Sequence, residues 1–247
     1  MTASAKRLLA TSLVSSLLVV IAGCADPHPE LPAKLTHDFT NKADGPVEST
    51  ADTSQWWTQT GSSPQAAPAV VNAGFTDADT QPGPSASYLT VRLREPVTHV
   101  AAEFDFGPTG TDGENVTLIA SSKNLPGGTS GAGPATDLAM HLAFTETGWI
   151  YSTVSGGSMA LTTLKSVDYG SYRPETALQK VSVVLDAANN RATVHGADGK
   201  VTDVVDPSIG AVRSPYITFE VYYGAANTDK RAFIRKVQAD SLTGPSS

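Results

Sequence analysis

Strict alternation of apolar and polar residues is the feature that most restricts how this chain of 247 residues can fold. In residues 98–106 the even positions are apolar, and the odd positions include His99, Glu103 and Asp105. The same pattern runs through residues 137–144 and 216–223. Because successive side chains of a β-strand point to opposite faces, each segment predicts a strand with one face on a core and the other in solvent.

Short segments rich in β-branched and aromatic residues follow one another along the chain, separated by Gly, Pro, Asn and Asp. Residues 186–192 (DAANNRA) and 196–200 (GADGK) carry the signals of tight hairpin turns. No long stretch shows the 3.6-residue period of an amphipathic helix. About ten or more strands in roughly 200 residues predict an all-β chain, folded as a two-sheet antiparallel sandwich.

The N-terminus has the organisation of a secretory signal. Lys6 and Arg7 precede an apolar run that is short for a membrane span and ends in small residues. Its last four residues, 21–24 (IAGC), resemble the lipobox of bacterial lipoproteins. That resemblance implies cleavage after residue 23, lipid attachment to Cys24, and an extracytoplasmic domain anchored to the cell membrane.

We therefore expect a signal peptide at residues 1–23, a lipidated cysteine with a Pro-rich tether at 24–34, one β-sandwich domain at 35–242, and a short tail at 243–247. Cys24 is the single cysteine, so an intramolecular disulfide is excluded. The formal net charge of −7 argues against a nucleic-acid partner. The membrane is the first expected partner.

Two segments resemble a known family. Residues 37–61 (HDFTNKADGPVESTADTSQWWTQTG) are similar to the opening segment of concanavalin A-like lectin and glucanase domains, which occur in actinobacterial and phage surface proteins. Residues 216–224 (YITFEVYYG) and 232–240 (AFIRKVQAD) resemble their closing strands. The resemblance implies a jelly roll of two curved antiparallel sheets, and ligands that are commonly carbohydrates, bound on the concave face or its rim loops.

The acids in residues 103–107 (EFDFG) raise the question of catalysis. Retaining glycosidases need two carboxyl groups, one nucleophile and one acid/base. In the glucanases of the family, Glu103 would match the nucleophile and Asp105 its helper. The acid/base position holds Gly107, or Pro108 with a bulged spacing, and neither can donate a proton. We favour a surface role for both acids, and keep catalysis, with His99 as a further candidate, as an alternative.

Outward-facing aromatic and polar residues favour carbohydrate binding, because sugar rings stack on exposed aromatic rings and polar groups bind the hydroxyls. The binding candidates are Trp149, Tyr151, Tyr216, Glu220, Tyr222 and His141. Core packing is the alternative for the tryptophans. His99, His141 and the nearby acids lack the short spacings of a zinc site. No cofactor is expected, although oxygen-rich loops at 77–80, 111–115 and 227–230 leave calcium open.

These observations together predict a lipid-anchored envelope protein that recognises a polysaccharide without cleaving it. Two alternatives stay open. One is a polysaccharide hydrolase or lyase with a site around Glu103 and Asp105. The other is a structural or protein-interaction lipoprotein that binds no sugar.

Overall fold

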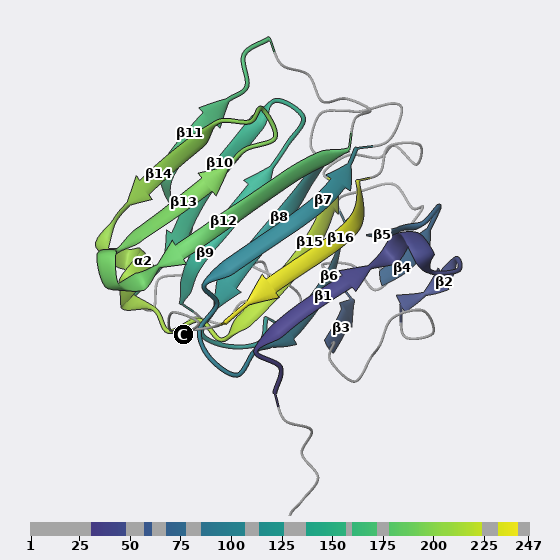
Figure 1. The fold of residues 1–247 in the computed structure, drawn as a ribbon, viewed down its shortest axis with the longest axis horizontal. Helices are drawn as coiled ribbons and strands as arrows, with labels where there is room; N and C mark the ends of the chain where they lie inside the picture. The colour runs from purple at the N-terminus through teal and green to yellow at the C-terminus, as the bar shows by residue number, and fades with distance from the viewer. Residues whose placement is uncertain are drawn as a thin grey trace, which may run out of the picture.

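The computed structural model describes residues 31–47, 57–60, 68–77, 85–106, 114–125, 137–156, 160–171, 178–223 and 232–241. They form two antiparallel sheets packed face to face (Figure 1). This confirms the prediction of an all-β, two-sheet antiparallel sandwich. Within these residues, no helix has the length and apolar character that a membrane span requires.

Sheet A has nine strands and faces the viewer in Figure 1. Its order is β14-β13-β12-β7-β16-β5-β4-β2, and β1 also pairs with β16. The bounds are β1 (Lys34–Asp38), β2 (Gly45–Pro46), β4 (Pro68–Val71), β5 (Gly74–Asp77), β7 (His99–Asp105), β12 (Gln179–Asp186), β13 (Arg191–His195), β14 (Val201–Val205) and β16 (Phe233–Asp240).

Sheet B lies behind it with seven strands in the order β11-β10-β9-β8-β15-β6-β3. The bounds are β3 (Trp57–Thr60), β6 (Ser85–Arg92), β8 (Glu114–Ser121), β9 (Leu138–Phe144), β10 (Gly148–Val154), β11 (Thr162–Asp168) and β15 (Tyr216–Tyr223). Three short helices complete the described elements: η1 (Phe39–Asn41), η2 (Ala187–Asn189) and α2 (Pro207–Ala211). The two C-terminal strands, β15 and β16, are inserted between earlier strands of sheets B and A.

The core lies between the sheets and follows the alternation. The even positions of β7 and the residue after it, Val100, Ala102, Phe104 and Phe106, are all in the main core cluster. The Phe104 ring lies 5.6 Å from the rings of both Phe106 and Phe144. Since every described strand lies between Lys34 and Asp240, a chain that begins at Ala25 retains the whole of the described fold.

Both predicted hairpin turns are confirmed. Between β12 and β13, the Asp186 side chain accepts a hydrogen bond from the Asn189 N–H, and Asn190 takes the left-handed conformation that closes the turn. Between β13 and β14, Gly199 has a φ of +76°, which glycine adopts without strain. These two turns place three consecutive strands at one side of sheet A.

The alternation in residues 137–144 is interrupted at one point. Met140, Leu142 and Phe144 are in the main core, but Leu138 is not. A register shift between Ala120 and Ser121 of β8 turns Leu138 to the outward side of sheet B. There it forms a second apolar cluster with Ile119, Leu125 and Val154.

Candidate functional site

The acids of the EFDFG segment lie on the outward face of β7, in sheet A. Glu103 stands opposite Lys180 of β12 and Lys236 of β16. Its Oε1 is 3.3 Å from Lys180 Nζ. A hollow of about 200 Å³ over Ala101 is bordered by these three side chains and by Thr36 and Gln238.

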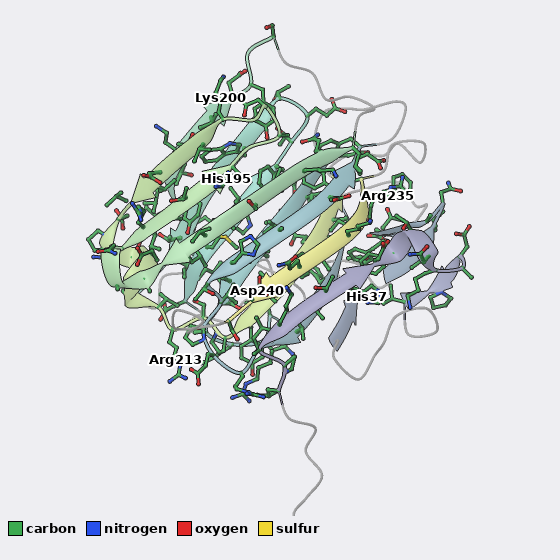
Figure 2. All side chains as sticks on the ribbon, in the orientation of Figure 1. His37, His195, Lys200, Arg213, Arg235 and Asp240 are labelled. Carbon is green, nitrogen blue, oxygen red and sulfur yellow. The ribbon has the colours of Figure 1, made fainter. Side chains whose placement is uncertain are left out.

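Asp105 is held by an arginine. Arg235 Nε and Nη2 lie 2.6 and 3.2 Å from Asp105 Oδ2 and Oδ1, which is the two-pronged geometry of a strong charge-assisted pair. Arg235 Nη1 also donates to the Asn72 carbonyl, in the turn between β4 and β5. Figure 2 shows Arg235 near the start of β16. Asp105 and Arg235 thus fasten the β4–β5 hairpin to β7 and β16.

His99, the third catalytic candidate, also faces outward, at the start of β7. Its Nδ1 is 2.9 Å from Asp240 Oδ2, at the opposite end of β16 from Arg235 (Figure 2). Asp240 Oδ2 also accepts from Gln238 Nε2 at 2.8 Å. All three catalytic candidates are therefore engaged in bonds between neighbouring strands of sheet A. Gly107 and Pro108 lie outside the described residues.

Arg235→Ala is expected to lower the free energy of unfolding by about 2–3 kcal/mol, because it leaves the Asp105 carboxylate, whose side chain is 14% exposed, without its cation. Lys180→Ala should cost less than about 1 kcal/mol, since Lys180 is 69% exposed and solvent weakens its pair with Glu103. Urea unfolding of the two variants measures both. Equal losses would contradict a structural role for the Asp105–Arg235 pair.

The outward face of sheet B carries a different set of residues. Glu220 of β15 stands between Tyr88 of β6 and Thr117 of β8. Two residues before Glu220 in β15, the hydroxyl of Thr218 lies 2.8 Å from the hydroxyl of Thr90 in β6. These side chains point away from the core, because Phe219 and Val221, which alternate with them, lie in it.

This face is buried, which corrects the expectation that the polar side of β15 meets solvent. Glu220 is 5% exposed, Tyr88 2%, and Thr117 and Thr218 0%. The alternation gave the direction of each side chain correctly, but direction alone does not say whether a face is covered. We call Tyr88, Thr90, Thr117, Thr218 and Glu220 the polar row.

Glu220 is the acid at the centre of the polar row. Burial raises the pKa of Glu220 to about 7, although hydrogen bonds with the Thr117 and Tyr88 side chains act in the opposite direction. Thr117 extends the hydrogen-bond network along β8 towards the end of the sheet, because its hydroxyl donates to Asn115 Oδ1 at 2.8 Å. Asn115 and its cross-strand partner Tyr222 are both half-buried, so the row ends at residues that a ligand can reach.

His141 lies on the same face, on β9, opposite Ile119 of β8 and Ser152 of β10. Burial lowers the pKa of His141 to about 4. The imidazole is therefore neutral at pH 7, with one nitrogen that donates and one that accepts. A neutral ring of this kind suits hydrogen bonding to hydroxyl groups.

Two of the predicted binding residues are not on this face. Trp149 and Tyr151 lie in the core, 2% and 0% exposed. The Tyr151 hydroxyl donates to the Ala139 carbonyl at 2.9 Å, and burial raises the pKa of Tyr151. Both rings face inward because Ile150, between them, takes the outward position of β10 and is 41% exposed. They cannot stack on a ligand bound outside the sheet.

The other four candidates, Tyr216, Glu220, Tyr222 and His141, share the outward face of sheet B, with Tyr216 and Tyr222 half-buried. Sequence reasoning missed Tyr88, Thr90, Asn115 and Thr117. In residues 86–92, polar Tyr88 and Thr90 alternate with apolar Leu89 and Val91, so this signal was present. Their pairing with β15 required the strand order.

Metal binding is neither shown nor excluded. In the described part of the chain, no three His, Cys, Asp or Glu side chains are grouped so as to hold a metal ion. Most of the oxygen-rich loops at 77–80, 111–115 and 227–230 lies outside it, and so does Cys24.

No protein-family model and no curated protein matches the chain. Solved structures do. A point mutant of the Emp46p carbohydrate recognition domain is 12% identical with a TM-score of 0.59, over 88% of this chain and 98% of that one. The Emp46p domain also matches in potassium-bound and metal-free forms.

Two further solved structures that match are a glucanase and a seed lectin. The endo-β-1,3-glucanase from Pyrococcus furiosus is 13% identical with a TM-score of 0.55, over 85% of this chain and 94% of that one. The Lotus tetragonolobus seed lectin is 14% identical with a TM-score of 0.54, over 86% and 100%. The chain also spans 19% of the length of a sialidase. At such identities the likeness concerns the fold, a concanavalin A-like jelly roll shared by lectins and glucanases.

Proposed function

We propose that this protein is a lipid-anchored cell-envelope protein that binds a polysaccharide, without cleaving it, at the outward face of sheet B. The observation that carries the proposal is the polar row. Its side chains lie on the outward face of sheet B, not in the core, yet they have little exposure to solvent, and the row continues to half-buried Asn115 and Tyr222. Burying polar groups costs free energy unless they are hydrogen-bonded, and a few converging polar groups beside aromatic rings are typical of small-molecule sites.

Binding is favoured over hydrolysis by the number and placement of the acids. Among the described side chains that point outward from β6, β15, β8 and β9, Glu220 is the one acid. A retaining glycosidase needs two carboxyl groups about 5–5.5 Å apart. Glu103 and Asp105 lie on the other sheet, paired with Lys180 and Arg235. Because lectins and glucanases share this fold, the fold alone does not decide between binding and hydrolysis, and the choice must be argued from the residues of the site.

The membrane location follows from the N-terminal segment. The lipobox-like residues 21–24 place the lipidated residue at Cys24, shortly before the described fold begins at Leu31. The segment between Cys24 and the start of the described fold serves as the tether, which is shorter than the predicted range 24–34 because Lys34 already belongs to β1, and the sandwich lies on the extracytoplasmic side.

The proposal is tested with the chain from Ala25 to Ser247 and purified bacterial envelope polysaccharides. Calorimetry records binding, and the same samples are assayed for new reducing ends. Heat of binding without new reducing ends is the expected result. New reducing ends that disappear in Glu103→Gln would establish the hydrolase alternative, and the absence of both signals would favour the protein-interaction alternative.

Tyr222→Ala should weaken polysaccharide binding about fivefold, because it removes the half-buried ring beside Asn115, and loss of one stacking ring is worth about 1 kcal/mol. Lys236→Ala, on the outward face of sheet A, is the control and should bind as the wild type does. Calorimetric titration of the polysaccharide that binds best gives both affinities. A larger loss for Lys236→Ala would move the site to the hollow over Ala101.

A further inference from the structure

The end of the sandwich at which the chain enters the fold has its own charge pattern. β1 begins and β16 ends at the lower edge of Figure 1. The Ser241 N–H donates to the Ala33 carbonyl at 2.8 Å, and the Arg94 N–H donates to the Pro32 carbonyl at 2.9 Å. Arg94 Nε also donates to the Leu31 carbonyl at 3.3 Å. Residues 31–33 are thus held against the segment that follows β6.

Five exposed cations surround this entry point, and we call them the basic rim: Lys34, Arg92, Arg94, Lys123 and Arg213. Hydrogen bonds and strand pairing show that they belong to one end. Arg92 stands opposite Tyr216, which also pairs with Ser121, and the Ser121 hydroxyl donates to the Lys123 carbonyl. The Leu93 N–H donates to the Pro215 carbonyl, two residues after Arg213. Figure 2 shows Arg213 at the same lower edge.

Among the described residues, the acids beside the rim are fewer than its five cations: Glu95, Asp137 and Asp240. Glu95 Oε2 is 3.0 Å from Arg213 Nη2, and Asp240 Oδ1 is 3.7 Å from Lys34 Nζ. Asp186 and Asp206, farther along this end, accept hydrogen bonds within η2 and α2. Among the described residues the rim is therefore locally positive, in a chain whose formal net charge is −7.

We propose that the basic rim docks on an anionic phospholipid surface. Only residues 25–30 separate Cys24 from Leu31, and seven residue steps span at most about 25 Å even when fully extended. A lipidated Cys24 would hold the rim within that distance of the headgroups, where each cation raises binding to anionic lipid roughly fivefold. The inference rests on the membrane location included in the proposed function, and not on sugar binding.

Docking by the rim would also orient the binding face. β15 runs from Tyr216, beside Arg92 of the rim, to Tyr222 and its partner Asn115 at the far end of the sheet. With the rim on the lipid, Tyr222 and Asn115 point away from the membrane. The acidic remainder of the chain is repelled by the same lipid charge, which reinforces this orientation.

The test uses the chain from Ala25 to Ser247, which lacks the anchor, and two kinds of vesicle: phosphatidylcholine alone, and equal parts of phosphatidylcholine and phosphatidylglycerol. Sedimentation at low salt should show binding to the anionic vesicles alone, and about 0.5 M salt should abolish it by screening. Equal binding to both vesicles, or none to either, would overturn the proposal.

Matched variants locate the interaction. Arg94→Gln with Lys123→Gln and Arg213→Gln should weaken binding to the anionic vesicles about a hundredfold, at roughly fivefold for each cation. Lys165→Gln with Lys180→Gln and Lys200→Gln makes the same charge change elsewhere, and should weaken it less than about threefold. Equal losses would overturn the proposal. Polysaccharide binding by the rim variant should be unchanged, so failure here is distinct from failure of the sugar site.

Discussion

Between pH 4 and pH 8, Glu220→Gln is expected to gain about 3 kcal/mol in free energy of unfolding over the wild type. The pKa of Glu220 is about 7 in the folded protein, against an ordinary value of 4.5. The folded state therefore holds a proton that the unfolded state has released. The stabilisation is fully present below about pH 4.5 and is lost as the pH rises through 7, at about 1.4 kcal/mol per pH unit.

His141 produces the opposite slope, so the difference between variant and wild type is the informative quantity. Its pKa is about 4 in the folded protein against an ordinary value of 6.5, so its stabilisation is present above pH 6.5 and is lost as the pH falls towards 4. Between about pH 4.5 and 6.5 the two slopes offset each other in the wild type. Urea unfolding across pH 4–8 of wild type and Glu220→Gln removes the His141 contribution by subtraction.

Glu103→Gln is the matched control for this measurement, because it neutralises a carboxyl on the other sheet in the same way. The Glu103 side chain is 27% exposed and its Lys180 partner 69%, so its difference curve should stay within about 1 kcal/mol. A Glu220→Gln curve as flat as this control would mean that Glu220 is not buried as the structure places it.

Phe104→Ala should cost about 3–5 kcal/mol of unfolding free energy, the usual range for truncating a buried phenylalanine. Phe104 is 0% exposed, and its ring contacts the rings of Phe106, two residues along the chain, and Phe144 in the opposite sheet. Removing it opens a cavity at a junction of the two sheets. Urea unfolding measures the loss, and Val184→Ala, at a side chain 42% exposed on the same sheet, should cost less than about 1 kcal/mol.

The inward and outward sides of β7 and β15 could be predicted from sequence, because their apolar positions alternate strictly with polar ones. β10 could not be predicted in this way. In residues 148–154 (GWIYSTV), Trp149 and Tyr151 alternate with Ile150, so both faces begin with large apolar side chains. The side that packs in the core was decided by tertiary packing, in which Trp149 and Tyr151 join the main core cluster, and the Tyr151 hydroxyl donates to the carbonyl of Ala139 in the neighbouring strand β9.

The composition of the candidate site could be predicted only in part. Glu220 and Tyr222 were found because β15 shows a clear pattern, but their neighbours come from strands more than ninety residues earlier in the chain. Which strand lies beside which depends on long-range pairing that a single sequence does not reveal. Burial of the row was also unpredictable, since an alternating strand has the same pattern whether its polar side is open or covered.

The claim that the outward face of sheet B binds the polysaccharide is tested most directly by one comparison. Asn115→Ala with Tyr222→Ala removes the two half-buried side chains at the end of the polar row, and Thr36→Ala with Gln238→Ala removes two polar side chains from the hollow on sheet A. Calorimetric titration of both double variants with the same polysaccharide should show binding lost in the first and unchanged in the second. Unchanged binding in the first variant would contradict the account.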